Sequence, residues 1–94
     1  MITLFHWDIP QTLQEEFGGF NSSEIVNPFV AYADFCFKTF GSKVEHWFTF
    51  NEPYVYCVTG HGTGTGAPGL MEPEQGVYQC GHNTLLAHAY AYEK

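Results

Sequence analysis

Apolar residues gather in two short runs and one periodic stretch in the first half of the chain. The run at 44–50 is rich in β-branched and aromatic residues, which is typical of a strand buried on both faces. A similar run at Ile2–Phe5 predicts another strand, and the segment 27–40 between them has helical periodicity. Residues 2–50 are therefore predicted to form one strand-helix-strand unit, whose connection suits parallel, neighbouring strands.

The predicted helix has recognisable ends. We expect Asn27 to cap it and Pro28 to occupy its first position, where proline is favoured. A capping box at 21–24 is the alternative, but it would place Pro28 in the helix interior, where proline is costly. A short turn at 23–26 would precede the helix, and Gly41 would close it. The residues expected to pack on the sheet follow a helical stripe: Phe29, Ala33, Cys36 and Phe40.

Polar residues follow each predicted strand, and a proline closes each group. Residues 6–10 read His-Trp-Asp-Ile-Pro, and residues 51–53 read Asn-Glu-Pro. Proline cannot donate to a sheet ladder, so each strand should stop at this point. In parallel α/β sheets, catalytic side chains usually lie at the carboxyl ends of the strands. We therefore expect His6, Asn51 and Glu52 to lie close together and to face one pocket.

These motifs resemble those of the β-glucosidases of glycoside hydrolase family 1. The resemblance rests on the groups just described and on Gly-Gly-Phe at 18–20, the run 46–53, the glycine-rich segment 60–69, Gly-His-Asn at 81–83 and Ala-His-Ala at 87–89. Asn-Glu-Pro alone also occurs in other barrel glycosidases, but the combination is specific, and its order and spacing match along almost the whole chain. The glycine-rich segment is more similar to that of the animal branch, especially the insect type, than to that of plants.

The resemblance implies an α/β fold, the TIM or (β/α)8 barrel, which needs about 250 residues or more. The chain has 94 residues, so residues 1–94 are expected to be one partial (β/α)8 glycosidase domain. They would run from barrel strand 3 (Ile2–Phe5) through strand 4 (44–50) to the start of helix 4 (82–94). Nothing in them matches the later strand that carries the nucleophilic glutamate of the family. We therefore expect a truncated piece of a longer parent protein.

The resemblance also implies a role for each polar residue. Glu52 matches the acid/base of the family, which must still carry its proton near neutral pH, and we expect partial burial to favour that. Asn51 matches the residue that hydrogen-bonds the sugar 2-hydroxyl, and His6 matches the histidine that binds another hydroxyl of the same ring. A nucleophile about 5–5.5 Å from Glu52 would give retention of configuration. Thioglucoside-hydrolysing plant members have glutamine in place of this acid, so glutamate favours an O-glycosidase.

Two functions follow from these observations. The first is a segment of a retaining, β-glucosidase-like glycosidase that acts on a small β-glycoside or an oligosaccharide. The alternative is a non-catalytic gene remnant or a sugar-binding fragment. A continuation of the gene into a strand with a nucleophile motif like Thr-Glu-Asn-Gly would separate the two. No cofactor is expected for either, and no metal, because the histidines and the three cysteines do not form a compact ligand spacing.

Composition argues against other classes of partner. Ten acidic residues against three lysines give a net charge of −7, which disfavours nucleic-acid binding. No apolar run approaches the length of a membrane span. Hydrophobic residues make up 45% and charged residues only 14%, which indicates a piece of a larger core. The odd number of cysteines shows no pairing pattern. Asn-Ser-Ser at 21–23 fits a glycosylation acceptor, and an extracellular parent is favoured.

Overall fold

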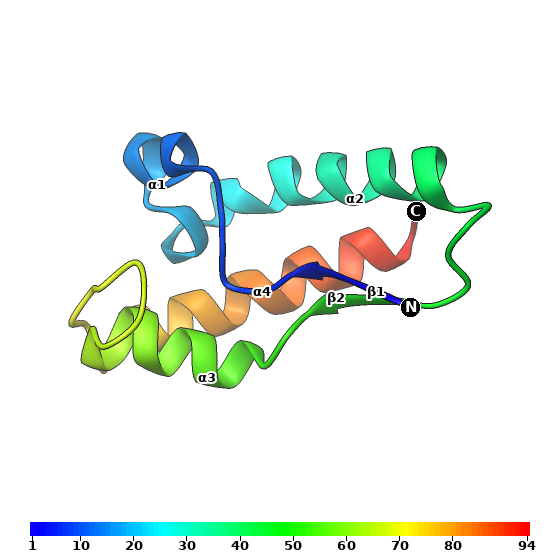
Figure 1. Cartoon of the computed structure of the whole chain (residues 1–94). Helices are drawn as coiled ribbons and strands as arrows, with labels where there is room; N and C mark the ends of the chain where they lie inside the picture. Colours follow the sequence, from blue (N-terminus) through cyan, green and yellow to red (C-terminus); the bar gives the residue numbers. More distant parts are fainter.

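Two parallel strands form the small sheet of the molecule, which a computed structural model describes over all 94 residues. Strand β1 (Ile2–Phe5) pairs with β2 (Trp47–Phe50), with Ile2 opposite Trp47 and Phe5 opposite Phe50. Helix α2 (Val26–Phe40) connects them (Figure 1). The predicted strand-helix-strand unit with parallel neighbours is confirmed.

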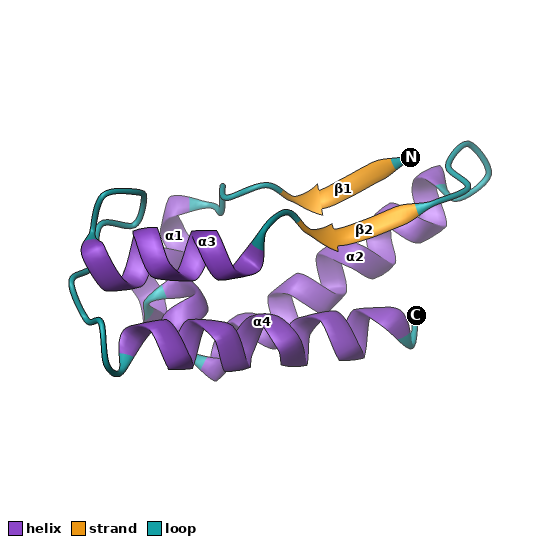
Figure 2. Ribbon diagram, turned by 90° about the horizontal axis from the view of Figure 1, so that it is seen from below, coloured by secondary structure: helices purple, strands orange, loops and turns teal.

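The remaining elements are helical and lie before and after this unit. Figure 2 shows α2 passing behind the strands, and the last helix, α4, running beside β2 on the side away from β1. None of the helices combines the length and the hydropathy that crossing a membrane would require. Their bounds are Gln11–Phe17 for α1, Gly19–Asn21 for η1, Ser23–Ile25 for η2, Pro53–Val58 for α3, Thr59–Thr63 for the π-helical turn η3, and Gly76–Tyr92 for α4.

Phe20 lies at the centre of the hydrophobic core. Its side chain is fully buried, and its ring centroid lies 5.0 Å from that of Phe5 and 5.6 Å from that of Phe50. The two preceding glycines adopt positive φ angles, 87° for Gly18 and 57° for Gly19, a backbone conformation that side-chain-bearing residues rarely adopt. The glycine pair therefore makes the turn that directs Phe20 under the sheet.

The start of α2 differs from the prediction. The helix begins at Val26, and Asn27 is its second residue rather than its cap. The Ser22 hydroxyl instead accepts a 3.1 Å hydrogen bond from the backbone N–H of Glu24, and the turn η2 leads directly into the helix. Pro28 is tolerated as the third helical residue because N–H groups of the first turn have no partner within the helix.

The predicted end of α2 is confirmed, but the predicted stripe of residues that pack on the sheet is one residue too long. The helix ends at Phe40, and Gly41 follows with a right-handed φ of −58° instead of a left-handed cap. Phe29, Ala33 and Cys36 are buried as expected, whereas Phe40 is 45% exposed because it lies in the last turn, beyond the strands. The core side of α2 therefore ends one turn before the helix does.

The second strand and the last helix also have different bounds from those expected. Strand β2 covers four residues, so residues 44–46 belong to the preceding loop. Phe48 is 53% exposed, so residues 1–94 do not cover both faces of the strand, and its burial on both faces stays a prediction for the whole barrel. Helix α4 begins at Gly76, six residues before the predicted start at 82. Gly76 and Gly81 disfavour helix locally, but tertiary packing overrides this preference.

A disulfide joins α3 to α4. Cys57 and Cys80 are bonded with their Cα atoms 5.6 Å apart, and both side chains are buried. Cys36 is free and lies on the core side of α2. Spacing along the chain did not reveal the pair, because it depends on how two separate helices pack. The bond holds the segment after β2 against the last helix.

Candidate active site

The two polar groups lie at the same end of the sheet. Phe5 pairs with Phe50, so His6 and Asn51 follow directly after a cross-strand pair. The ladder continues one residue further, because the Asn51 N–H donates a 2.9 Å hydrogen bond to the Phe5 carbonyl. The indole Nε1–H of Trp7 donates to the Asn51 carbonyl, also at 2.9 Å. The prediction that His6, Asn51 and Glu52 share one edge of the sheet is confirmed.

Glu52 stands at a sharp change of direction between β2 and α3. Its backbone is left-handed, with φ 40° and ψ 63°, and Pro53 opens the helix directly after it. The residue before a proline is disfavoured in the right-handed helical region, so Glu52 cannot simply extend the helix backward. Its carbonyl accepts a 3.0 Å hydrogen bond from the Tyr56 N–H. The strand, the turn and the helix start together set the position of the Glu52 carboxyl group.

Residues 1–94 leave Glu52 exposed, and its expected partial burial stays a prediction for the whole barrel. Glu52 and His6 are exposed, Asn51 is half-buried, and the neighbouring Tyr54 is 78% exposed. The ion pair of the chain, between Lys38 and Asp34, lies on α2, away from the strand ends. The Glu52 carboxylate is therefore free to meet a group that approaches this edge.

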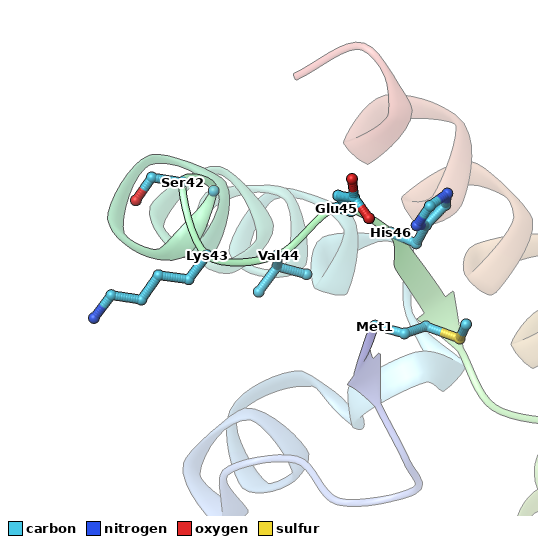
Figure 3. Close-up of a pocket in the computed structure, with 7 residues that line it drawn as sticks. Met1, Ser42, Lys43, Val44, Glu45 and His46 are labelled. Atoms are coloured by element: carbon cyan, nitrogen blue, oxygen red, sulfur yellow. The ribbon is translucent and has the colours of Figure 1, made fainter.

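The main hollows of the surface are not lined by His6, Asn51 or Glu52, so the pocket expected around these residues stays a prediction for the whole barrel. One of them is lined by Met1 and by residues 41–46, at the amino ends of the strands (Figure 3). Catalytic sites of parallel sheets lie at the opposite end, where Glu52 is found. A barrel mouth is built from the loops of several strands, and two strands alone do not enclose one.

Two of the histidines have structural surroundings. The His88 Nδ1 lies 2.7 Å from the Thr49 hydroxyl and ties α4 to β2. His61 is fully buried, packs against the ring of Tyr56 and has no hydrogen-bond partner at either ring nitrogen. Burial lowers the pKa of His61, which the negative charge of Glu72 partly opposes, and burial raises the pKa of Tyr56 to about 12. His61 is therefore neutral in the folded chain near pH 7.

Trp7 is a residue of this edge to which the sequence analysis assigned no role. Its indole N–H bonds the Asn51 carbonyl at the end of β2, and its ring meets that of His6 at the end of β1. The sequence contains a signal for this contact, because the same order of strand, polar group and proline occurs twice. That repetition indicates two adjoining turns, although the hydrogen bond between them requires the tertiary structure.

The chain belongs to glycosyl hydrolase family 1, whose model it matches over residues 1–94. It is 49% identical over 100 residues to furostanol glycoside 26-O-beta-glucosidase from Hellenia speciosa, covering 97% of this chain and 18% of that protein. The crystal structure of the β-glucosidase from Trichoderma harzianum superposes with a TM-score of 0.93 at 40% identity, covering 99% of this chain and 20% of that one.

A rice β-glucosidase has a similar fold over the same region. The solved structure is of a variant in which one glutamate is replaced by glutamine, and it is described as a covalent complex with Glc. It matches with a TM-score of 0.90 at 36% identity, covering 97% of this chain and 21% of that one. The chain thus spans about one fifth of the length of the relatives it matches. The family resemblance and the α/β fold, as part of a (β/α)8 barrel, are confirmed. The similarity to the insect-type branch stays a prediction.

Proposed function

We propose that residues 1–94 are the acid/base segment of a retaining, β-glucosidase-like hydrolase that cleaves O-glycosidic bonds. The observation that carries this proposal is the position of Glu52 in a family 1 chain, directly after β2 and beside His6 and Asn51. Carboxyl groups at the carboxyl ends of parallel strands are suited to catalysis because substrates reach this edge of the sheet. The relatives described as β-glucosidases support the same class of substrate.

Glu52 would act twice in each turnover. It first gives its proton to the leaving glycosidic oxygen, which would otherwise depart as an unstable alkoxide. It then removes a proton from the water molecule that releases the bound sugar. Its exposed carboxylate makes no side-chain hydrogen bond within this chain, so it is available for both steps.

Asn51 and His6 would hold the sugar ring. The Asn51 carboxamide would hydrogen-bond the 2-hydroxyl, a contact that strengthens as positive charge develops on the ring. His6, at the end of the neighbouring strand, would bind another hydroxyl of the same sugar. The parallel pairing of β1 with β2 supports this division, because it brings both residues to one edge.

The nucleophile would come from a part of the protein outside residues 1–94. Retention requires a second carboxylate about 5–5.5 Å from the acid/base, which forms a covalent glycosyl intermediate. The rice relative described in a covalent complex with Glc supports such an intermediate in this family. The disulfide between Cys57 and Cys80 supports an extracellular protein, because disulfides persist in oxidising compartments.

Replacement of Glu52 by alanine in the full-length protein tests the assignment. Glu52→Ala should slow the hydrolysis of an alkyl glucoside by about 10²–10⁴-fold, the usual contribution of a positioned proton donor. A dinitrophenyl glucoside should lose much less in its glycosylation step, because its leaving group departs without a proton. Added azide needs no base and should restore turnover of the activated substrate, forming glycosyl azide with retained configuration.

Glu45→Ala is the matched control, because Glu45 is also exposed but precedes β2 at the opposite end of the sheet. It should leave both substrates unaffected. Equal rate losses for the two leaving groups in Glu52→Ala, with no rescue by azide, would show that Glu52 is not the acid/base.

The isolated 94-residue chain is expected to show no measurable β-glucosidase activity, because it would lack the nucleophile. The purified chain and its Glu52→Gln variant should both be inactive toward an aryl glucoside. Turnover that persists in the variant indicates contamination. Turnover that the variant abolishes would contradict the expectation that the isolated chain is inactive.

A further inference from the structure

We propose that Trp7 is a positioning residue for Glu52, acting through the carbonyl of Asn51; this inference rests on the function proposed above. Trp7 follows β1 and Glu52 follows β2, and the two sites are brought together only by the parallel pairing of the strands. The Trp7 Nε1–H donates a 2.9 Å hydrogen bond to the Asn51 carbonyl across a separation of 44 residues.

Unusual backbone conformations occur at Trp7, the donor of this hydrogen bond, and at Glu52, the residue after the acceptor. Trp7, with φ 78°, and Glu52, with φ 40°, are the two residues other than glycine that have a positive φ in the chain. Such conformations cost free energy and persist only where the surrounding structure holds them, often at functional sites. Here both occur on adjoining strand ends, and one side-chain hydrogen bond links Trp7 to the Asn51 carbonyl, in the peptide unit that precedes Glu52.

Three consecutive peptide units around Glu52 are each held by a hydrogen bond. The Asn51 N–H is held by the Phe5 carbonyl at 2.9 Å, and the Glu52 carbonyl is held by the Tyr56 N–H at 3.0 Å. The peptide unit between them carries the Asn51 carbonyl, and only the Trp7 indole holds it. The orientation of this unit sets ψ of Asn51 and φ of Glu52, and therefore the direction of both side chains.

The environment of Trp7 does not suggest a packing role alone. Its side chain is 38% exposed, and its ring meets that of His6 edge-on with centroids 5.8 Å apart. Trp47 offers a contrast, because it packs against Phe37 with centroids 5.0 Å apart and its ring makes no hydrogen bond. Trp7 thus contacts the proposed sugar-binding histidine with its ring and the proposed acid/base turn with its N–H.

The test removes the indole N–H in the full-length protein. In one variant Trp7 is replaced by benzothienylalanine, which keeps the shape of the side chain and has sulfur in place of N–H. The other variant is Trp7→Phe, and Trp47→Phe is the matched control. Rates are expressed per active site, counted from the burst of dinitrophenolate, so that loss of folded protein does not affect them.

A positioning role predicts a loss that depends on the leaving group. Without the N–H, kcat/KM for an alkyl glucoside should fall about tenfold, the effect of losing one hydrogen bond at a placed group, while that for the dinitrophenyl glucoside falls about twofold or less. The Trp47→Phe control should change neither by more than about twofold. Equal losses for both glucosides, or no loss for either, would overturn the proposal.

Glu52→Ala in the same experiment separates the two hypotheses. If Glu52→Ala shows the dependence on the leaving group and the benzothienylalanine variant does not, the positioning role of Trp7 is wrong and the proposed function stands. If Glu52→Ala itself shows no such dependence, both are overturned.

Discussion

Loss of the Cys57–Cys80 disulfide should lower the free energy of unfolding by about 3.4 kcal/mol at 25 °C, from the entropy of closing a loop across a sequence separation of 23 residues. The closed segment contains the glycine-rich residues 60–69, which gain much freedom when the chain unfolds. Because both cysteine side chains are buried, their removal would also leave small cavities. Reduction keeps the side chains in place and therefore measures the cross-link more directly than substitution does.

The assay compares urea unfolding of the full-length protein with and without a thiol reductant, followed by circular dichroism. Reduction should lower the extrapolated free energy of unfolding by about 2–4 kcal/mol. The double variant Cys57→Ala/Cys80→Ala should respond to the reductant less than the unmodified protein does, by the contribution of this bond. Cys36→Ala should respond to it as the unmodified protein does, because Cys36 is the free cysteine.

Two results would refute this reasoning. The first is alkylation of Cys57 and Cys80 in the denatured but unreduced protein, because it would show that the two thiols are not bonded. The second is a reductant effect below about 1 kcal/mol in a protein whose disulfide is proven by peptide mapping. That outcome would mean that the folded structure already restricts the segment without the bond.

Further predictions concern His61 and Asn83. Burial lowers the pKa of His61 in the folded chain. Below about pH 6.5 the unfolded chain therefore binds a proton at this residue more readily than the folded chain does, and the free energy of unfolding falls as the pH falls. The loss between about pH 8 and about pH 5, measured by urea unfolding, should be smaller in His61→Phe; an equal loss would exclude this origin. The buried Asn83 Nδ2 donates a 2.9 Å hydrogen bond to the Phe20 carbonyl. Asn83→Leu should lower the free energy of unfolding by about 1–3 kcal/mol, against less than about 0.5 kcal/mol for His82→Ala at an exposed position.

Local signals were sufficient for the elements that lead to the proposed site. Strand β1 has the predicted bounds because an apolar run and the polar group behind it define both of its ends within a few residues. The end of β2 and the place of Glu52 follow from Pro53, which cannot take part in a ladder. The shared edge of His6 and Asn51 then required only that the strands be parallel, which the length of the connection indicated.

Other local signals were misleading. Asn27 and Pro28 have the composition of a helix start, but the preceding turn, capped by Ser22, brings the chain into the helical conformation earlier. Gly76 and Gly81 made the first turns of α4 unrecognisable. In both regions, packing against the rest of the chain outweighs preferences of about 1 kcal/mol per residue.

The sequence by itself determined the family, the parallel strand-helix-strand unit and the edge at which Glu52 stands. Tertiary structure alone decided three contacts: the disulfide between residues separated by 23 positions, the bond from Trp7 to Asn51 across 44, and that from Asn83 to Phe20 across 63. The physical reason is the distance along the chain over which each kind of interaction acts. Hydrophobic periodicity and proline act over a few neighbouring residues, whereas pairing and burial depend on which elements pack together.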